Sequence, residues 1–155
     1  GHDYCGPLIK PIQTNVDGIR IGPDVAEFWE EPELTAMGDY SGRGARNAII
    51  TTSERLWLRD VVDVDPDVAF FDRSAVQFDE RTLGALRDLA AITGFVGTSD
   101  HVADLDAAER GELASLLDHR PNVHRTSWLG WQVDDRTIDF AWAHRVPTST
   151  TGSTP

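Results

Sequence analysis

Carboxylates follow three short apolar runs of the sequence. "GIRIGPD" ends at Asp24, "RLWLRDVVDVDPD" contains Asp63, Asp65 and Asp67, and "ITGFVGTSD" ends at Asp100. If the runs are parallel strands of an α/β fold, their carboxyl ends share one side, where such folds place functional groups. Converging carboxylates suit divalent-metal binding or the acid and base steps of glycoside hydrolysis. Aspartates also cap helices and support turns, so each one alone has a structural explanation.

Arg20 lies inside the first apolar run, four residues before Asp24. A guanidinium donates several hydrogen bonds in a fixed geometry, so it can orient a carboxylate or bind a sugar hydroxyl. A structural ion pair within the fold is an equally open alternative. Phe28 and Trp29 follow the aspartate. Aromatic faces pack on sugars, but core packing explains these two residues as well.

Helical patterns separate the apolar runs. "FDERTLGALRDLAAITG" predicts a helix with Asp79 as N-cap and Gly94 as its end. "LDAAERGELASLLDH" predicts another, with Asp106 and Glu109 as a capping box. Its inward-facing residues are expected to be Leu113, Leu116 and Leu117. "GARNAIITTSERLWL" predicts a less regular helix. Strands that alternate with helices indicate an α/β fold with a parallel sheet.

The pattern changes near residue 122. "WLGWQVDDRTIDFAWA" contains two alternating runs on either side of Asp134 and Asp135, which predicts a β-hairpin. We therefore expect an α/β region over 1–121 and a β region over 122–146. The final residues, 147–155, are Ser-, Thr-, Gly- and Pro-rich and are predicted to form a disordered tail.

Composition limits the function classes. The net charge of -12 argues against nucleic acid and anionic membranes as partners, because both require clustered Lys and Arg. No apolar run approaches the roughly 20 residues of a membrane span. The weakly basic "SGRGARN" favours a loop before a helix over a phosphate site. The five histidines show no metal-ligand spacing, and no cofactor motif stands out.

The single cysteine, Cys5, excludes an internal disulfide and a cysteine-based zinc site. Only His2 lies near it in sequence, so a packed or substrate-lining thiol is favoured over a nucleophile. The redox compartment is reducing or undetermined, and we expect a cytoplasmic protein. Because the chain begins at Gly1 without an initiator, we also expect it to be a piece of a longer protein.

Four stretches together resemble the α-galactosidase (melibiase) group of glycoside hydrolases, in its bacterial branch. They are "DYCGPL", "VDGIRIGPDVAEFWE", "ARNAIITTSERLWLRDVVDVDPDVAFF" and "LGALRDLAAITGFVGTSD", in the order of the family. The resemblance implies a (β/α)8 TIM-type barrel that hydrolyses terminal α-linked galactose or a related sugar with retention. The chain would hold its second half, strands 5–8, followed by the hairpin that starts the C-terminal β region.

The resemblance also implies roles for individual residues. Asp24 matches the general acid/base at the end of the sixth strand, and Arg20 matches the arginine that contacts it and the sugar. Asp65 and Asp67 match the Asp-Pro-Asp of the seventh strand, which supports the sugar site. Cys5 falls where the fifth strand supplies a sugar-contacting residue. "GFVGTSD" would be the eighth strand, and Trp29 joins the set as a candidate substrate-binding residue.

The sequence departs from the family at two points. No segment matches the fourth strand with its Lys-x-Asp nucleophile, and Val64 stands where the family has Asn. A full barrel takes about 250 residues. Three hypotheses therefore remain: a fragment of a hydrolase that is inactive alone, a carbohydrate-binding or scaffold half-barrel that has lost hydrolysis, and an acid-lined metal protein. A half-barrel has open strand edges, so we expect a homodimer or pairing with the upstream half of the barrel.

Overall fold

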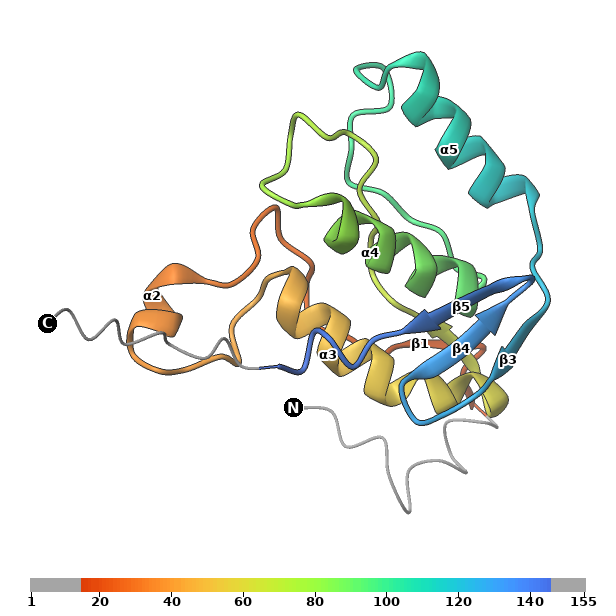
Figure 1. Ribbon diagram of the computed structural model, residues 1–155, viewed down its shortest axis with the longest axis horizontal. Coiled ribbons are helices and arrows are strands. Elements are labelled where there is room, and N and C mark those ends of the chain that lie inside the picture. Colours follow the sequence, from red (N-terminus) through yellow and green to blue (C-terminus); the bar gives the residue numbers. More distant parts are fainter. Residues whose placement is uncertain (1–14, 146–155) are drawn as a thin grey trace, which may run out of the picture.

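The computed structural model describes residues 15–145, in which short strands and helices alternate and an antiparallel sheet follows (Figure 1). The elements, in chain order, are β1 (Gly18–Arg20), α2 (Pro32–Ala36), α3 (Ala45–Arg55), the 3-10 helix η2 (Leu56–Asp60), β2 (Asp63–Asp65), α4 (Glu80–Thr93), α5 (Ala107–Asp118), β3 (Val123–Arg125), β4 (Gly130–Val133) and β5 (Arg136–Asp139).

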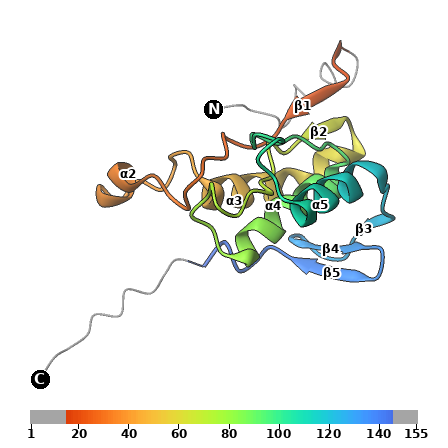
Figure 2. The same cartoon turned by 90° about the horizontal axis from the view of Figure 1, so that it is seen from above.

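These elements form three layers. Figure 2 shows the pair β1–β2 on one side, the helices α3 and α4 in the middle, and the sheet β3–β4–β5 on the other side. β1 and β2 pair in parallel, with Arg20 opposite Asp65, so the predicted parallel pairing of these two runs is confirmed. The parallel arrangement places the carboxyl ends of both strands together, and with them the residues that follow each strand.

The two helix starts predicted from sequence are confirmed. The Asp79 carboxylate accepts a hydrogen bond of 2.8 Å from the Thr82 N–H at the start of α4, and α4 ends at Gly94 with φ 73°. A left-handed φ of this kind costs glycine little, because it has no Cβ. Asp106 and Glu109 form the expected capping box of α5. Backbone donors that the helices leave unpaired are thus satisfied by side chains.

The inward face of α5 differs from the prediction at one residue. Leu113 and Leu116 pack partly against the core, but Leu117 is 56% exposed, so its expected inward orientation is wrong. Residues three apart share a helix face, whereas the next residue along points about 100° away. On α5 only the face with Leu113 and Leu116 meets the core, and Leu117 points away from it.

The predicted hairpin is present as β4 and β5, which pair antiparallel, and β3 adds a third strand. Asp134 takes the positive φ of 52° that a tight two-residue hairpin turn requires. Trp131, Val133 and Phe140 from this region are buried in the same hydrophobic cluster as residues of α3 and α4. The sheet therefore packs on the helices as a continuation of one core. The division of the chain at residue 122 stays a prediction.

One predicted strand is shorter in the structure, and another is not formed. In the 55–71 run, residues 56–60 form η2 and only Asp63–Asp65 are extended in the sheet. In the 92–100 run, α4 continues to Thr93, and residues 95–99 form no strand, which contradicts the predicted eighth strand "GFVGTSD". Gly94 and Gly97 disfavour a regular strand. The segment is instead connected to the rest of the fold by isolated hydrogen bonds. One of them runs from the Ala69 N–H to the Gly97 carbonyl at 2.9 Å.

Some predictions fall beyond the part of the chain that the structure describes. The opening strand with Cys5 and the 147–155 tail lie outside residues 15–145. The parallel pair β1–β2 is consistent with a piece of a barrel, and the second half of a (β/α)8 barrel stays a prediction. Within residues 15–145, no helix is both long enough and apolar enough to span a membrane.

Candidate functional site

Arg20 joins two of the predicted aspartates at the carboxyl ends of β1 and β2. Its guanidinium contacts Asp24 Oδ1 at 3.1 Å and makes a closer contact with the carboxylate of Asp67. The Asp24 side chain is 76% exposed, whereas that of Asp67 is 16% exposed. The arginine thus bridges one carboxylate in solvent and one that is mostly covered.

Backbone geometry holds Asp67 in place. Pro66 ends β2, and Asp67 follows with a φ of 78°, a conformation that aspartate tolerates better than most side chains. The Asp67 N–H donates to Asp65 Oδ1 at 2.7 Å, and Asp67 Oδ2 accepts from the Val25 N–H at 2.7 Å. Asp67 therefore fastens the segment that carries Asp24 to the end of β2.

Burial raises the pKa of Asp67 above the ordinary value of an aspartate. The hydrogen bond from Val25 and the charge of Arg20 oppose this shift, and the nearby Asp24 and Asp65 add to it. A carboxyl group with a raised pKa holds its proton to a higher pH than an ordinary aspartate does.

Trp29 does not join this cluster. Its ring stacks on Trp142 with the centroids 5.8 Å apart and an interplanar angle of 14°. It lines a cavity that none of Arg20, Asp24 and Asp67 lines. The structure thus places this predicted substrate-binding residue against an aromatic neighbour in the packed part of the fold.

Asp100, the carboxylate of the third run, has structural partners. Its Oδ2 accepts from the Phe71 N–H at 2.6 Å and from the Thr98 hydroxyl at 2.7 Å. These bonds tie the segment after α4 to the segment after β2. The capping and turn role considered for single aspartates therefore describes Asp100 well.

A cavity of about 350 Å³ runs along the strand pair next to the cluster. Arg20 and Asp65 line it, together with Phe95, an aromatic residue that is 49% exposed. Charged and aromatic groups at the edge of one cavity are the combination that binds hydroxyl-rich ligands.

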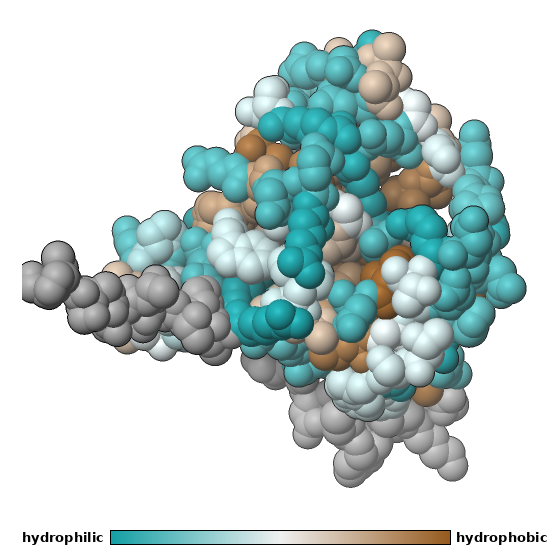
Figure 3. All heavy atoms as spheres, in the orientation of Figure 1, coloured by the Kyte–Doolittle hydropathy of each residue, from teal (hydrophilic) through white to brown (hydrophobic). Residues whose placement is uncertain are grey.

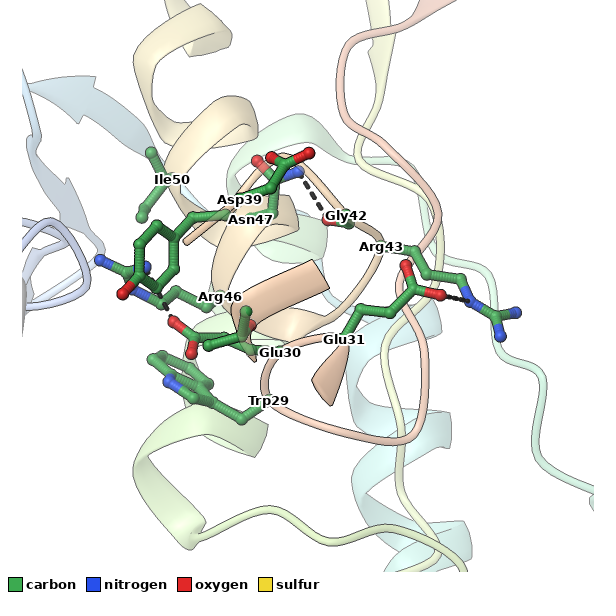
Figure 4. A pocket seen from close by; sticks show the side chains of 11 residues that line it. Trp29, Glu30, Glu31, Asp39, Gly42, Arg43, Arg46, Asn47 and Ile50 are labelled. Atoms are coloured by element: carbon green, nitrogen blue, oxygen red, sulfur yellow. Dashed lines mark hydrogen bonds and ion pairs between the residues drawn. The ribbon is translucent and has the colours of Figure 1, made fainter. Parts of the chain in front are cut away.

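A second cavity, of about 300 Å³, lies between α2 and α3 (Figure 4). Arg46 on α3 pairs with Glu30 at 2.8 Å, and its guanidinium lies 5.4 Å from the centre of the Tyr40 ring. No sequence pattern singles out these residues as a site. The nearby "SGRGARN" stretch predicts a loop before a helix, and the structure has that loop and helix.

The start of α3 is closed to a phosphate group. The Ala45 N–H donates to the Phe28 carbonyl and the Arg46 N–H to the Trp29 carbonyl, both at 3.0 Å. Gly44 allows this approach, since its φ is 136° and a Cβ there would meet the Trp29 carbonyl at 2.8 Å. The donors that bind anions at a helix start are therefore already in use.

A larger cavity of about 700 Å³ lies between α4, α5 and the antiparallel sheet. Figure 3 shows apolar atoms in the hollow beside α5, on a face that is otherwise largely hydrophilic. Its polar lining includes Asp88 and the pair His119–Asp134, whose side chains are 2.6 Å apart. None of the predicted site residues lines it. In residues 15–145, no group of three or more His, Cys, Asp and Glu side chains is arranged to hold a metal ion.

Comparison with solved structures finds glycoside hydrolases whose fold this chain shares over most of its length. The chain is similar to TtGalA, an α-galactosidase from Thermus thermophilus, in complex with p-nitrophenyl α-D-galactopyranoside. The TM-score is 0.76 and the identity 36%, over 82% of this chain and 27% of that one. TtGalA in complex with stachyose matches with a TM-score of 0.61 and 40% identity, over 65% of this chain and 22% of that one.

The resemblance to α-galactosidases expected from the motifs is thus confirmed. The chain spans about a quarter of the length of the α-galactosidase that it matches. No family model matches the sequence.

Proposed function

We propose that this chain contributes the acid/base half of the active site of a retaining glycoside hydrolase that acts on terminal α-linked galactose or a related sugar. The observation that carries the proposal is the bridge from Arg20 to Asp24 and Asp67 at the carboxyl ends of β1 and β2. It occurs in a chain that is 36% identical to an α-galactosidase over 82% of its length.

Asp24 is suited to proton transfer because its carboxyl group is exposed to an incoming ligand. In a retaining mechanism the acid gives its proton to the oxygen of the leaving sugar, while a second carboxylate attacks the anomeric carbon. The same group then removes a proton from the water that releases the enzyme-bound sugar. Arg20 holds the Asp24 carboxylate in one orientation during both steps and can donate a hydrogen bond to a sugar hydroxyl.

Asp65 and Asp67 are proposed to support the sugar site. Asp67 anchors the Asp24 segment by accepting from the Val25 N–H, and the Asp65 carboxylate positions Asp67 by accepting from the Asp67 N–H. The nucleophile of the retaining mechanism matches no residue of this sequence. We propose that a further segment of barrel supplies it, and that Cys5 of this chain contacts the sugar from the fifth strand.

The test uses the complete gene product that carries this chain, with Asp24→Asn as the variant. General acid catalysis contributes about 10²- to 10⁴-fold to the rate. We therefore expect kcat/KM for stachyose to decrease by a factor in that range. The loss should be much smaller for p-nitrophenyl α-D-galactopyranoside, because nitrophenolate leaves without a proton. Azide should restore turnover of the nitrophenyl substrate and give a galactosyl azide product.

Asp60→Asn is the matched control, because Asp60 is an exposed aspartate at the end of η2, outside the cluster. It should leave both substrates unaffected. Stachyose turnover by the Asp24→Asn variant at the wild-type rate would refute the assignment of Asp24. Galactoside binding that weakens in an Arg20→Ala variant, without hydrolysis by the wild type, would instead favour the carbohydrate-binding module without catalysis.

A further inference from the structure

We propose that the cavity between α2 and α3 is a second carbohydrate-binding site, which takes one neutral pyranose unit. It is separate from the Arg20 cluster, since none of Arg20, Asp24, Asp65 and Asp67 lines it. Its volume of about 300 Å³ is at the lower end of small-ligand sites. The inference does not depend on hydrolysis at Asp24.

The charges of the cavity wall disfavour an anionic ligand. Glu30 pairs with Arg46 at 2.8 Å, and Glu31 pairs with Arg43 at 3.6 Å. Asp39 accepts a hydrogen bond of 2.9 Å from the Ser41 N–H. Because each arginine of the wall faces a glutamate, a phosphate group would find no uncompensated positive charge.

Hydrogen-bonding capacity remains in the same groups. The Arg46 side chain is only 8% exposed, and its buried Nε–H has no acceptor among the described residues. Each carboxylate offers about four lone-pair positions, and the pairing with arginine leaves some of these for hydroxyl donors. Sugar hydroxyls supply both donors and acceptors.

Aromatic side chains complete the site. Trp29 and Tyr40 line the cavity together with Glu30 and Arg46, and Figure 4 shows the Trp29 ring beside the Glu30–Arg46 pair. Stacking on Trp142 holds the Trp29 ring in place. Rigid aromatic surface next to planar polar groups binds the apolar face and the hydroxyls of a pyranose at the same time.

The cavity is held in a fixed shape by the backbone. Gly44 donates to the Asp24 carbonyl at 3.4 Å, and Asn47 Nδ2 donates to the Ser41 and Gly42 carbonyls at 2.9 and 2.7 Å. These bonds close the long loop between β1 and α3 at its base. A preformed site requires little ordering when the ligand binds.

Calorimetric titration of the complete gene product with D-galactose tests the proposal, in an Asp24→Asn background that prevents turnover of trace substrates. Tyr40→Ala removes an aromatic wall, and Tyr40 is 49% exposed, so folding should be retained. We expect this variant to bind galactose at this site about tenfold more weakly. Arg46→Lys keeps the charge beside Glu30 but loses the planar Nε–H donor, and a loss of about tenfold is expected again.

Trp128→Ala is the control, because Trp128 is another exposed aromatic residue, which lies before β4 and does not line this cavity. Unchanged galactose affinity in both cavity variants would overturn the proposal, as would an equal loss in Trp128→Ala. A Tyr40-sensitive signal from inorganic phosphate or a diamine, but not from galactose, would also overturn it. Galactose binding that depends on Tyr40 in a protein without hydrolytic activity would refute the proposed function and leave this inference standing.

Discussion

Asp67 shows how one buried carboxyl group links the candidate site to stability. Burial raises its pKa in the folded protein, so between the unfolded and folded pKa values the native state binds the proton more tightly. Stability then falls as the pH rises through that window, which begins near 4, the ordinary pKa of aspartate. The stabilisation that comes from the protonated Asp67 is complete below the unfolded pKa and is lost above the folded pKa.

The Asp67→Asn variant should reveal this dependence. Asn tolerates the positive φ at this position, so the backbone is preserved. We expect the stability of the wild type relative to this variant to decrease as the pH rises from about 4. Urea unfolding at a series of pH values measures the difference.

Asp72→Asn provides a control of opposite sign. Hydrogen bonds from Ser74 lower the pKa of Asp72, so its stabilising contribution is present above the unfolded pKa and lost as the pH falls. The wild type should therefore gain stability relative to Asp72→Asn as the pH rises. The same pH trend in both variants would contradict the burial of Asp67 as the cause.

At the scale of elements, caps and glycines set where the helices begin and end. The Asp79 cap and the Gly94 end of α4 are predictable from sequence because both are local features. The 3-10 helix η2 and the absence of a strand in 94–100 are not, since short apolar runs do not distinguish a strand from other buried backbone. The neighbours that such a run meets decide its form, and those are distant in sequence.

The cap of α4 can be tested with two substitutions at one position. Asp79→Ala removes the acceptor for the Thr82 N–H and should lower the free energy of unfolding by about 1 kcal/mol. Asp79→Asn keeps a cap of similar strength and should stay close to the wild type. Chemical denaturation followed by circular dichroism measures both. Equal losses in the two variants would show that the charge, and not the cap, stabilises this end.

At the scale of the whole molecule, the antiparallel sheet and the helices share a core. The fully buried Trp131 belongs to that core, and the Arg59 guanidinium from η2 lies 5.6 Å from the centre of its ring. The sequence indicated a separate β region because the hydrophobic period changes near residue 122. Period reports the type of element and carries no information on what its apolar face contacts.

Trp131→Ala tests whether these layers unfold together. Truncation of a buried Trp costs about 3–5 kcal/mol. If the layers share one core, the free energy of unfolding of the whole protein should decrease by this amount in a single transition. Trp128→Ala, at a residue that is 57% exposed, should change stability by no more than about 0.5 kcal/mol. Hydrogen exchange in α3 and α4 is the second measurement. Protection there that is unaffected by Trp131→Ala would mean that the sheet unfolds on its own.

The sequence by itself determined the features that depend on neighbouring residues: the caps of α4 and α5, the hairpin, the parallel runs with Arg20 and Asp24, and the likeness to α-galactosidases. Only the tertiary structure decided which carboxylates meet. In the structure Asp67 pairs with Arg20, and Asp100 accepts a hydrogen bond from the Phe71 N–H. Trp29 lines another cavity together with Arg46. The reason is physical, because burial, ion pairing and cavities arise between segments far apart in the chain, and local patterns do not encode those distances.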